Sequence, residues 1–253
     1  MFSFRLKRPG RIPPYHPPFR LCYYIIMKRG IFIVLEGPDR SGKSTQAALL
    51  KTWLEGLGHK VMVTREPGGT YLSERIRRIL LDPKSHIEPM TELFLYETSR
   101  IKHTLEKIIP ALAAGMVIIS DRYTLSTTAY QGYGRGLPLK TVETLNRIAT
   151  MGLKPHLTVV MDIPDKVFAQ RERLTRGRDR IEREPDQFRR RVNRAYKLLA
   201  RRPGMTRINA GRAVEAIQAE IRARVKNILK AYSAARKPRG HEGHEKTQRV
   251  KSD

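Results

Sequence analysis

Short apolar runs rich in β-branched residues alternate along the chain with longer stretches in which apolar residues recur every three or four positions. The longer stretches predict amphipathic helices, as in the apolar series Leu72, Ile76, Ile79 and Leu80. The short runs predict five β-strands, at residues 31–36, 60–64, 116–120, 157–162 and 206–209. Because parallel neighbours need crossover connections, this alternation predicts an α/β fold, a doubly wound five-stranded parallel sheet with helices on both faces.

The segment after the first predicted strand has the sequence of a phosphate-binding loop. GPDRSGKS matches the pattern G-x-x-x-x-G-K-[ST] and lies between a predicted strand and a predicted helix. In such a loop the backbone N–H groups wrap phosphates, Lys43 reaches the β- and γ-phosphates, and the Ser44 hydroxyl holds Mg²⁺. The pattern therefore predicts an ATP site made by Gly37, Pro38, Asp39, Arg40, Ser41, Gly42, Lys43, Ser44 and Thr45.

Charged residues also follow the second and third predicted strands, at the sheet edge where parallel sheets bind ligands. Asp121 ends an apolar strand beside the phosphate-binding loop, where a carboxylate is placed to contact Mg²⁺. Arg65 and Arg122 offer guanidinium forks for the phosphate of a second substrate. These residues predict a second phosphate-bearing ligand next to ATP.

An arginine-dense segment, residues 171–180, is interrupted by a glycine. It is typical of a short arginine-rich lid that closes over ATP, and the alternative is a solvated basic helix or a nucleic-acid patch. The basic stretch that follows carries an apolar stripe that predicts core packing, with Phe188, Val192, Tyr196 and Leu199 on one helical face.

The net charge of +26 favours anionic partners such as phosphates and nucleic acids. We expect residues 1–27 to be a disordered basic extension or a mis-assigned start, 28–232 to be the phosphate-loop domain, and 233–253 to be a disordered basic tail. Nucleic-acid binding by the two tails stays open. The single Cys22 excludes an internal disulfide framework, and the apolar run at 21–27 is too short to span a bilayer.

The chain resembles the thymidylate kinase family, and its bacterial members in particular, in four segments. These are FIVLEGPDRSGKSTQ from Phe32, TREPGGT from Thr64, DRYTLSTTAYQG from Asp121 and RGRDRIE from Arg176. The resemblance spans roughly residues 28–232. It implies a cytoplasmic nucleoside monophosphate kinase, commonly a homodimer, that converts dTMP to dTDP with MgATP and feeds dTTP synthesis.

The resemblance also implies roles for individual residues. Arg65 and Arg122 would clamp the dTMP phosphate. Tyr96, where the family usually has Phe, would stack on the base, and Arg100 would address the O4 edge of thymine. The remaining residues would contact the same two nucleotides: Asp39 at the 3′-hydroxyl side of dTMP, Ser126 and Thr127 near the base edge, Tyr130 at the 2′ position, and Arg171 against adenine.

The chain departs from the family in its arginines. An arginine in the phosphate-binding loop usually accompanies a lid poor in catalytic arginine, yet Arg40 occurs here together with Arg176 and Arg178. We expect Arg176 or Arg178 to stabilise the charge of the transition state, with Arg40 as the alternative. Lys43 and Arg122 complete the expected catalytic set.

Two other functions remain compatible with these residues. One is a kinase of another pyrimidine monophosphate such as dUMP, because Tyr96 and Thr127 alter the base pocket. The other is a nucleic-acid-binding phosphate-loop protein whose basic charge serves that binding.

Overall fold

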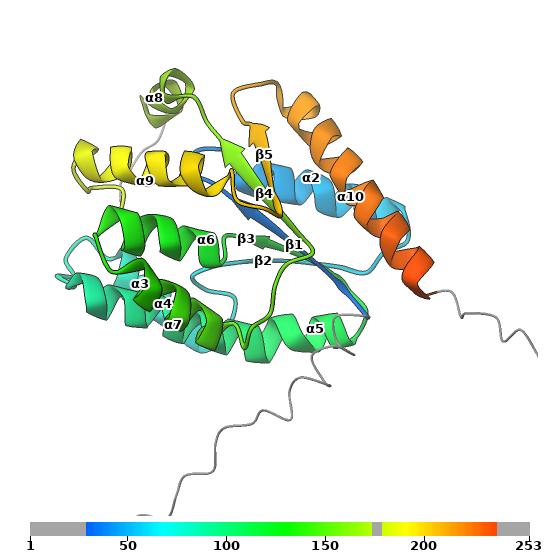
Figure 1. Ribbon diagram of the computed structural model, residues 1–253, viewed down its shortest axis with the longest axis horizontal. Helices are drawn as coiled ribbons and strands as arrows, with labels where there is room; N and C mark the ends of the chain where they lie inside the picture. The colour runs from blue at the N-terminus through cyan, green and yellow to red at the C-terminus, as the bar shows by residue number, and fades with distance from the viewer. Residues whose placement is uncertain (1–28, 174–178, 237–253) are drawn as a thin grey trace, which may run out of the picture.

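The computed structural model describes residues 29–173 and 179–236. A five-stranded, all-parallel sheet lies at its centre, with the strands in the order β2-β3-β1-β4-β5 (Figure 1). The predicted α/β fold is confirmed, and each predicted strand agrees with the structure to within one residue at each end. The strands are β1 (Ile31–Glu36), β2 (Val61–Arg65), β3 (Val117–Asp121), β4 (Leu157–Asp162) and β5 (Met205–Asn209).

Two helices, α2 (Lys43–Gly56) and α10 (Val214–Arg236), cover one face of the sheet (Figure 1). Alternate residues of β1 point to this face, where Ile33 and Leu35 pack with Leu50 of α2. All six residues of β1 are buried, because helices cover the sheet on both sides.

The other face is covered by a longer set of helices. Here α4 (Pro89–His103) continues through the π-helical turn η1 (Thr104–Ile108) into α5 (Ile109–Ala113), and Leu112 packs against Phe32. Helix α3 (Tyr71–Leu81) packs on α4. The remaining elements of this side are α6 (Thr124–Thr127), η2 (Thr128–Gly134), α7 (Leu139–Ala149) and α9 (Asp186–Leu199).

The stripe predicted on α9 is confirmed, because Phe188, Val192, Tyr196 and Leu199 are all buried. Helix α8 (Asp165–Arg173) precedes residues 174–178 of the predicted lid, which fall outside the described residues. The predicted extension at 1–27 also lies outside them. Helix α10 runs to Arg236, so the tail predicted from residue 233 is wrong in its first residues, and the rest of that segment is not described. None of the helices in the described ranges has both the length and the apolar character needed to cross a membrane.

Neighbouring leucines of α2 provide a matched test of this packing. Leu50 is fully buried against β1, whereas Leu49 is 36% exposed. We expect Leu50→Ala to lower the free energy of unfolding by about 2–5 kcal/mol, because it removes buried methyl groups and leaves a cavity. Leu49→Ala should change it by less than about 0.5 kcal/mol. Urea denaturation of both variants measures the difference, and equal losses would contradict this assignment of the core.

Candidate active site

The phosphate-binding loop joins β1 to α2, as the sequence predicts. Gly37 lies at φ +137°, and a Cβ there would approach the Met161 carbonyl oxygen to 2.5 Å, so the position requires glycine. The Lys43 ammonium donates to the carbonyl oxygens of Gly37 at 3.0 Å and Pro38 at 2.8 Å. Lys43 thus lies within the loop that would receive phosphates.

Ser44 and Asp121 meet beside this loop. The Ser44 hydroxyl donates to Asp121 Oδ2 at 2.7 Å, which joins the start of α2 to the end of β3. A hydroxyl and a carboxylate are hard oxygen ligands of the kind that Mg²⁺ prefers, so this pair fits the metal site that the sequence predicts. Both residues line a pocket of roughly 720 Å³ together with Lys43 and Thr45.

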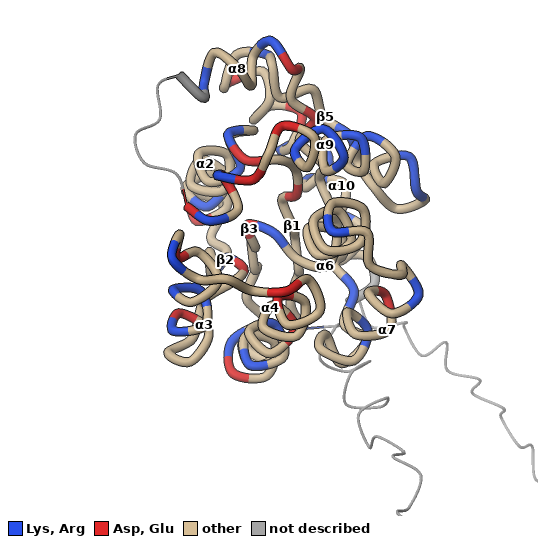
Figure 2. The backbone as a smooth tube through the Cα atoms, turned by 90° about the vertical axis from the view of Figure 1, so that its left-hand side faces the viewer, with Lys and Arg blue, Asp and Glu red and all other residues tan. Residues whose placement is uncertain are grey.

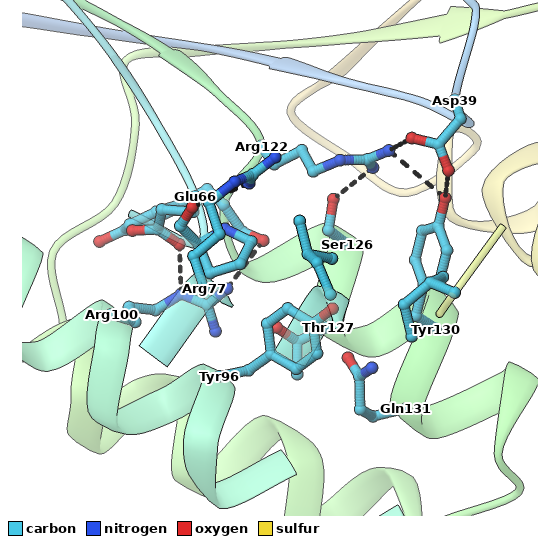
Figure 3. Close-up of a pocket in the computed structure, with 14 residues that line it drawn as sticks. Asp39, Glu66, Arg77, Tyr96, Arg100, Arg122, Ser126, Thr127, Tyr130 and Gln131 are labelled. Carbon is cyan, nitrogen blue, oxygen red and sulfur yellow. Dashed lines mark hydrogen bonds and ion pairs between the residues drawn. The ribbon is translucent and has the colours of Figure 1, made fainter. Parts of the chain in front are cut away.

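Arg122 lies at the centre of the site. Its guanidinium donates to Asp39, to the Gly37 carbonyl oxygen at 3.0 Å and to Ser126 Oγ at 3.0 Å. It also donates to the Tyr130 hydroxyl at 3.3 Å (Figure 3) and to the Tyr196 hydroxyl, which the figure does not draw, at 3.0 Å. One side chain therefore binds the loop, η2 and α9 together.

Asp39 carries the negative charge of this group. Its burial would raise the pKa of the carboxyl, but Arg122, Lys43 and the Tyr130 hydroxyl outweigh that effect and lower the pKa to about 2. Asp39 is therefore ionised at neutral pH, and it accepts from the Tyr130 hydroxyl at 2.9 Å. The two residues predicted at the sugar of dTMP, Asp39 and Tyr130, are in direct contact.

A buried carboxylate, Glu36, supports the segment after β3. It accepts from the backbone N–H groups of Tyr123 at 2.8 Å and Ser126 at 3.1 Å, and from Ser126 Oγ at 2.6 Å. Burial raises the pKa of Glu36. The Tyr196 hydroxyl of α9 lies 3.3 Å from it, so the helix after the lid reaches the site. Sequence reasoning assigned Tyr196 to the core alone, because its apolar spacing says nothing of its hydroxyl.

A pocket of roughly 550 Å³ lies on the other side of Arg122, between α3, α4 and η2 (Figure 3). Tyr96 and Arg100 enter it from α4, and Thr127 enters it from α6. The Thr127 side chain is 1% exposed, and its hydroxyl has no hydrogen-bond partner among the described residues. A buried polar atom of this kind is suited to a polar ligand edge.

Arg65 lies at a different place from the one that the sequence suggests, and Arg77 lies nearer to the predicted dTMP site. Arg65 is exposed, pairs with Glu74 at 3.0 Å and lines the Lys43 pocket, but it does not line the Tyr96 pocket. Arg77 of α3 lines both pockets and donates to the Pro67 carbonyl oxygen at 3.0 Å. Sequence reasoning missed Arg77 because it is one of three arginines in four residues, and the pattern does not say which one turns inward.

The elements next to the lid contact the loop. Arg171 of α8 donates to the Arg40 carbonyl oxygen at 2.8 Å and to the Ala210 carbonyl oxygen at 3.1 Å. The Arg40 guanidinium pairs with Glu182 at 3.2 Å and lies over the Phe168 ring. Arg176 and Arg178 lie outside the described residues. Figure 2 views this side of the molecule, with α8 above the ends of β1 and β3 and basic residues on the segments around them.

Comparison with known proteins gives one consistent result. The family model described as thymidylate kinase matches residues 35–221. A thymidylate kinase of Gloeobacter violaceus is 46% identical over 79% of this chain and 96% of its own length, and one of Pelotomaculum thermopropionicum is 45% identical over 81% and 96%. The crystal structure of a thymidylate kinase from Ehrlichia chaffeensis superposes with a TM-score of 0.64 at 28% identity, covering 78% of this chain and 98% of that chain.

Burial, assisted by the nearby positive charge of Arg122, lowers the pKa of Lys43 to about 8. Lys43 is therefore cationic below pH 8 and becomes neutral above it. Because phosphates favour the cation, we expect ATP binding to take up a proton at pH 9 and much less of one at pH 6.5. Isothermal titration calorimetry in buffers of different ionisation enthalpy measures this uptake. Lys43→Arg should abolish it, and equal uptake in both proteins would assign it to another group.

Proposed function

The chain belongs to the thymidylate kinase family and phosphorylates dTMP to dTDP with ATP, and we propose how its own residues divide that reaction. The phosphate-binding loop receives the ATP phosphates, and the Tyr96 pocket receives dTMP. The γ-phosphoryl group passes between them in line. The acceptor is already an anionic phosphate oxygen, so the reaction needs positioning and charge neutralisation rather than a strong general base.

The observation that carries this proposal is that the two pockets share four lining residues, which form a common wall between them. Asp39, Glu66, Arg77 and Arg122 line both the Tyr96 pocket and the Lys43 pocket. A donor phosphate and an acceptor phosphate held on the two sides of this wall would meet between two guanidinium groups. Arginine forks suit phosphate oxygens, so we propose Arg77 and Arg122 as the dTMP phosphate ligands, with Arg65 at the rim.

The dTMP nucleoside would lie along the pocket away from this wall. Tyr96 offers a ring to the base, and Thr127 offers its buried hydroxyl to the base edge. Tyr130, which is held by Asp39 and Arg122, would crowd the 2′ position and disfavour a ribonucleotide.

We propose that Ser44 and Asp121 hold Mg²⁺ with ATP, because their oxygen atoms already lie 2.7 Å apart beside Lys43. The bound ion would neutralise charge on the β- and γ-phosphates. Lys43 would contact the same phosphates, and Arg171, held between the loop and Ala210, would lie on the adenine side.

We further propose that Arg176 or Arg178 stabilises the charge of the transition state. The support is the position of Arg40, whose guanidinium is engaged by Glu182 and Phe168. An arginine held by a carboxylate in this way is less available to a transferring phosphoryl group.

The family resemblance also supports a cytoplasmic homodimer. Helix α3 carries apolar side chains at its surface that a second copy would cover, namely Tyr71, Leu72 and Ile79.

A coupled assay of ADP release tests the reaction and the base pocket together. We expect turnover with MgATP to be fastest with dTMP, slower with dUMP and at least about a hundredfold slower with dCMP, dGMP, AMP and UMP. A preference for dUMP would assign the pocket to another pyrimidine monophosphate. Failure to turn over any of these would favour the nucleic-acid-binding alternative.

Turnover of three arginine variants identifies the transition-state cation. We expect Arg176→Ala or Arg178→Ala to lower kcat on the order of a thousandfold, because such an arginine neutralises charge that develops during transfer. Arg40→Ala should lower kcat less, since it removes a contact to Glu182. A large loss in Arg40→Ala alone would contradict the proposal.

A further inference from the structure

The Arg100 guanidinium donates hydrogen bonds to four residues beside the proposed dTMP pocket. Its side chain is 2% exposed, and Nε donates to Glu66 Oε2 at 2.8 Å. Nη1 donates to Glu97 at 2.6 Å and to Asn146 at 2.7 Å, and Nη2 donates to the Tyr123 carbonyl oxygen at 3.1 Å. A guanidinium has five N–H groups, so one N–H of Nη2 is left without a partner in the described part of the chain. Arg100 lines the pocket, so a hydrogen-bond acceptor on a bound ligand could accept from this remaining N–H group.

Two further buried residues, His103 and Thr64, continue the hydrogen-bond network from Glu66. His103 is fully buried, and its Nδ1 lies 2.9 Å from Glu66 Oε1, the oxygen that Arg100 does not use. Its Nε2 lies 2.7 Å from the hydroxyl of Thr64 on β2. Neither Thr64 nor His103 lines the dTMP pocket.

The direction of these hydrogen bonds follows from the groups themselves. Although burial would raise the pKa of Glu66, Arg100 and His103 outweigh it and lower the pKa, so Glu66 is ionised and only accepts. His103 Nδ1 must therefore carry a proton and donate to Glu66, while Nε2 shares a hydrogen bond with the Thr64 hydroxyl. Hydrogen bonds therefore link Thr64 through His103 to Glu66, and Arg100 donates to the other oxygen of the same carboxylate.

The backbone of Gly69 packs closely against His103 and Thr64. A Cβ on Gly69 would lie 2.6 Å from His103 Cδ2 and 2.9 Å from Thr64 Oγ1. The ring is therefore confined between β2, Gly69 and Glu66. Both oxygens of Glu66 are hydrogen-bonded, one to His103 and the other to Arg100. The position of the His103 ring therefore sets the orientation of the Glu66 carboxylate, and the carboxylate in turn sets the plane of the Arg100 guanidinium.

We propose that the Thr64–His103 pair is a positioning device for base selection, which acts through Glu66 on Arg100. This inference rests on the proposed binding of dTMP in the Tyr96 pocket. Arg100 only donates, so its remaining N–H requires an acceptor on the base. The 4-carbonyl oxygen of thymine or uracil is one, whereas the 4-amino group of cytosine is a donor that would face the guanidinium.

Thr64→Val and Thr64→Ser test this device as a matched pair. Valine has the shape of threonine without the hydroxyl, while serine keeps the hydroxyl. We expect Thr64→Val to raise the KM for dTMP about tenfold and to reduce the ratio of kcat/KM for dTMP over dCMP about tenfold, because His103 loses the partner that holds its ring. Thr64→Ser should keep that ratio within about twofold of the wild-type value, and the KM for ATP should stay within about twofold in both.

A structural role would give a different result. Loss of packing lowers the active fraction for every substrate equally, so it leaves the ratio of dTMP to dCMP unchanged. Glu66→Gln provides a second variant should Thr64→Val fold poorly, and we expect it to reduce the same ratio at least as much. Unchanged ratios in these variants would overturn the proposal.

Arg100→Lys separates this inference from the function on which it rests. If the wild type selects dTMP, and Arg100→Lys loses that selection while Thr64→Val keeps it, the positioning role of His103 is wrong and the dTMP site stands. If the wild type does not turn over dTMP, the proposed function itself fails.

Discussion

The guanidinium of Arg122 is the interaction on which the arrangement of the site depends. Moving a cation from water into a partly buried position costs several kcal/mol unless acceptors surround it. The acceptors come from separate parts of the chain, namely the loop after β1, the segment of α6 and η2, and α9. The backbone of Arg122 is itself held, because its N–H donates to Leu35 on β1 and its φ is +74°. The loop, the Tyr96 pocket and helix α9 are thus aligned by one residue.

Although the chain carries a large positive charge, its buried arginines are paired with buried glutamates. Glu66 and Glu97 pair with Arg100, and Glu92 of α4, fully buried, accepts from Arg135 and Arg180. Each buried arginine of these groups faces at least one carboxylate, as the cost of burying a charge requires. Other basic residues of the described segments, such as those on the exposed faces of α9 and α10, lie at the surface, where water and salt screen their charge.

How much of this was predictable depends on the range of the interactions. The strands and the phosphate-binding loop depend on neighbours in sequence, and apolar runs and the GPDRSGKS pattern gave them correctly. Arg77 could not be chosen over Arg75 and Arg78, since which of them turns inward depends on how α3 packs on α4. The pairing of Arg40 with Glu182 joins residues far apart in sequence, and so does the contact of His103 with Thr64. No local pattern encodes such contacts, because each partner alone reads as an ordinary polar residue.

The segment after the predicted lid connects the Tyr96 pocket with the phosphate-binding loop. Arg180 donates through its backbone to the Leu81 carbonyl oxygen and through its side chain to Glu92, which fixes the segment to α3 and α4. Ile181 then lines the Tyr96 pocket, and Glu182 pairs with Arg40 of the phosphate-binding loop. On the other side of the lid, Arg171 is held by the same loop. Both ends of the lid are therefore attached to the walls that would contact the two nucleotides. In the sequence, Arg176 and Arg178 lie between these two attached ends.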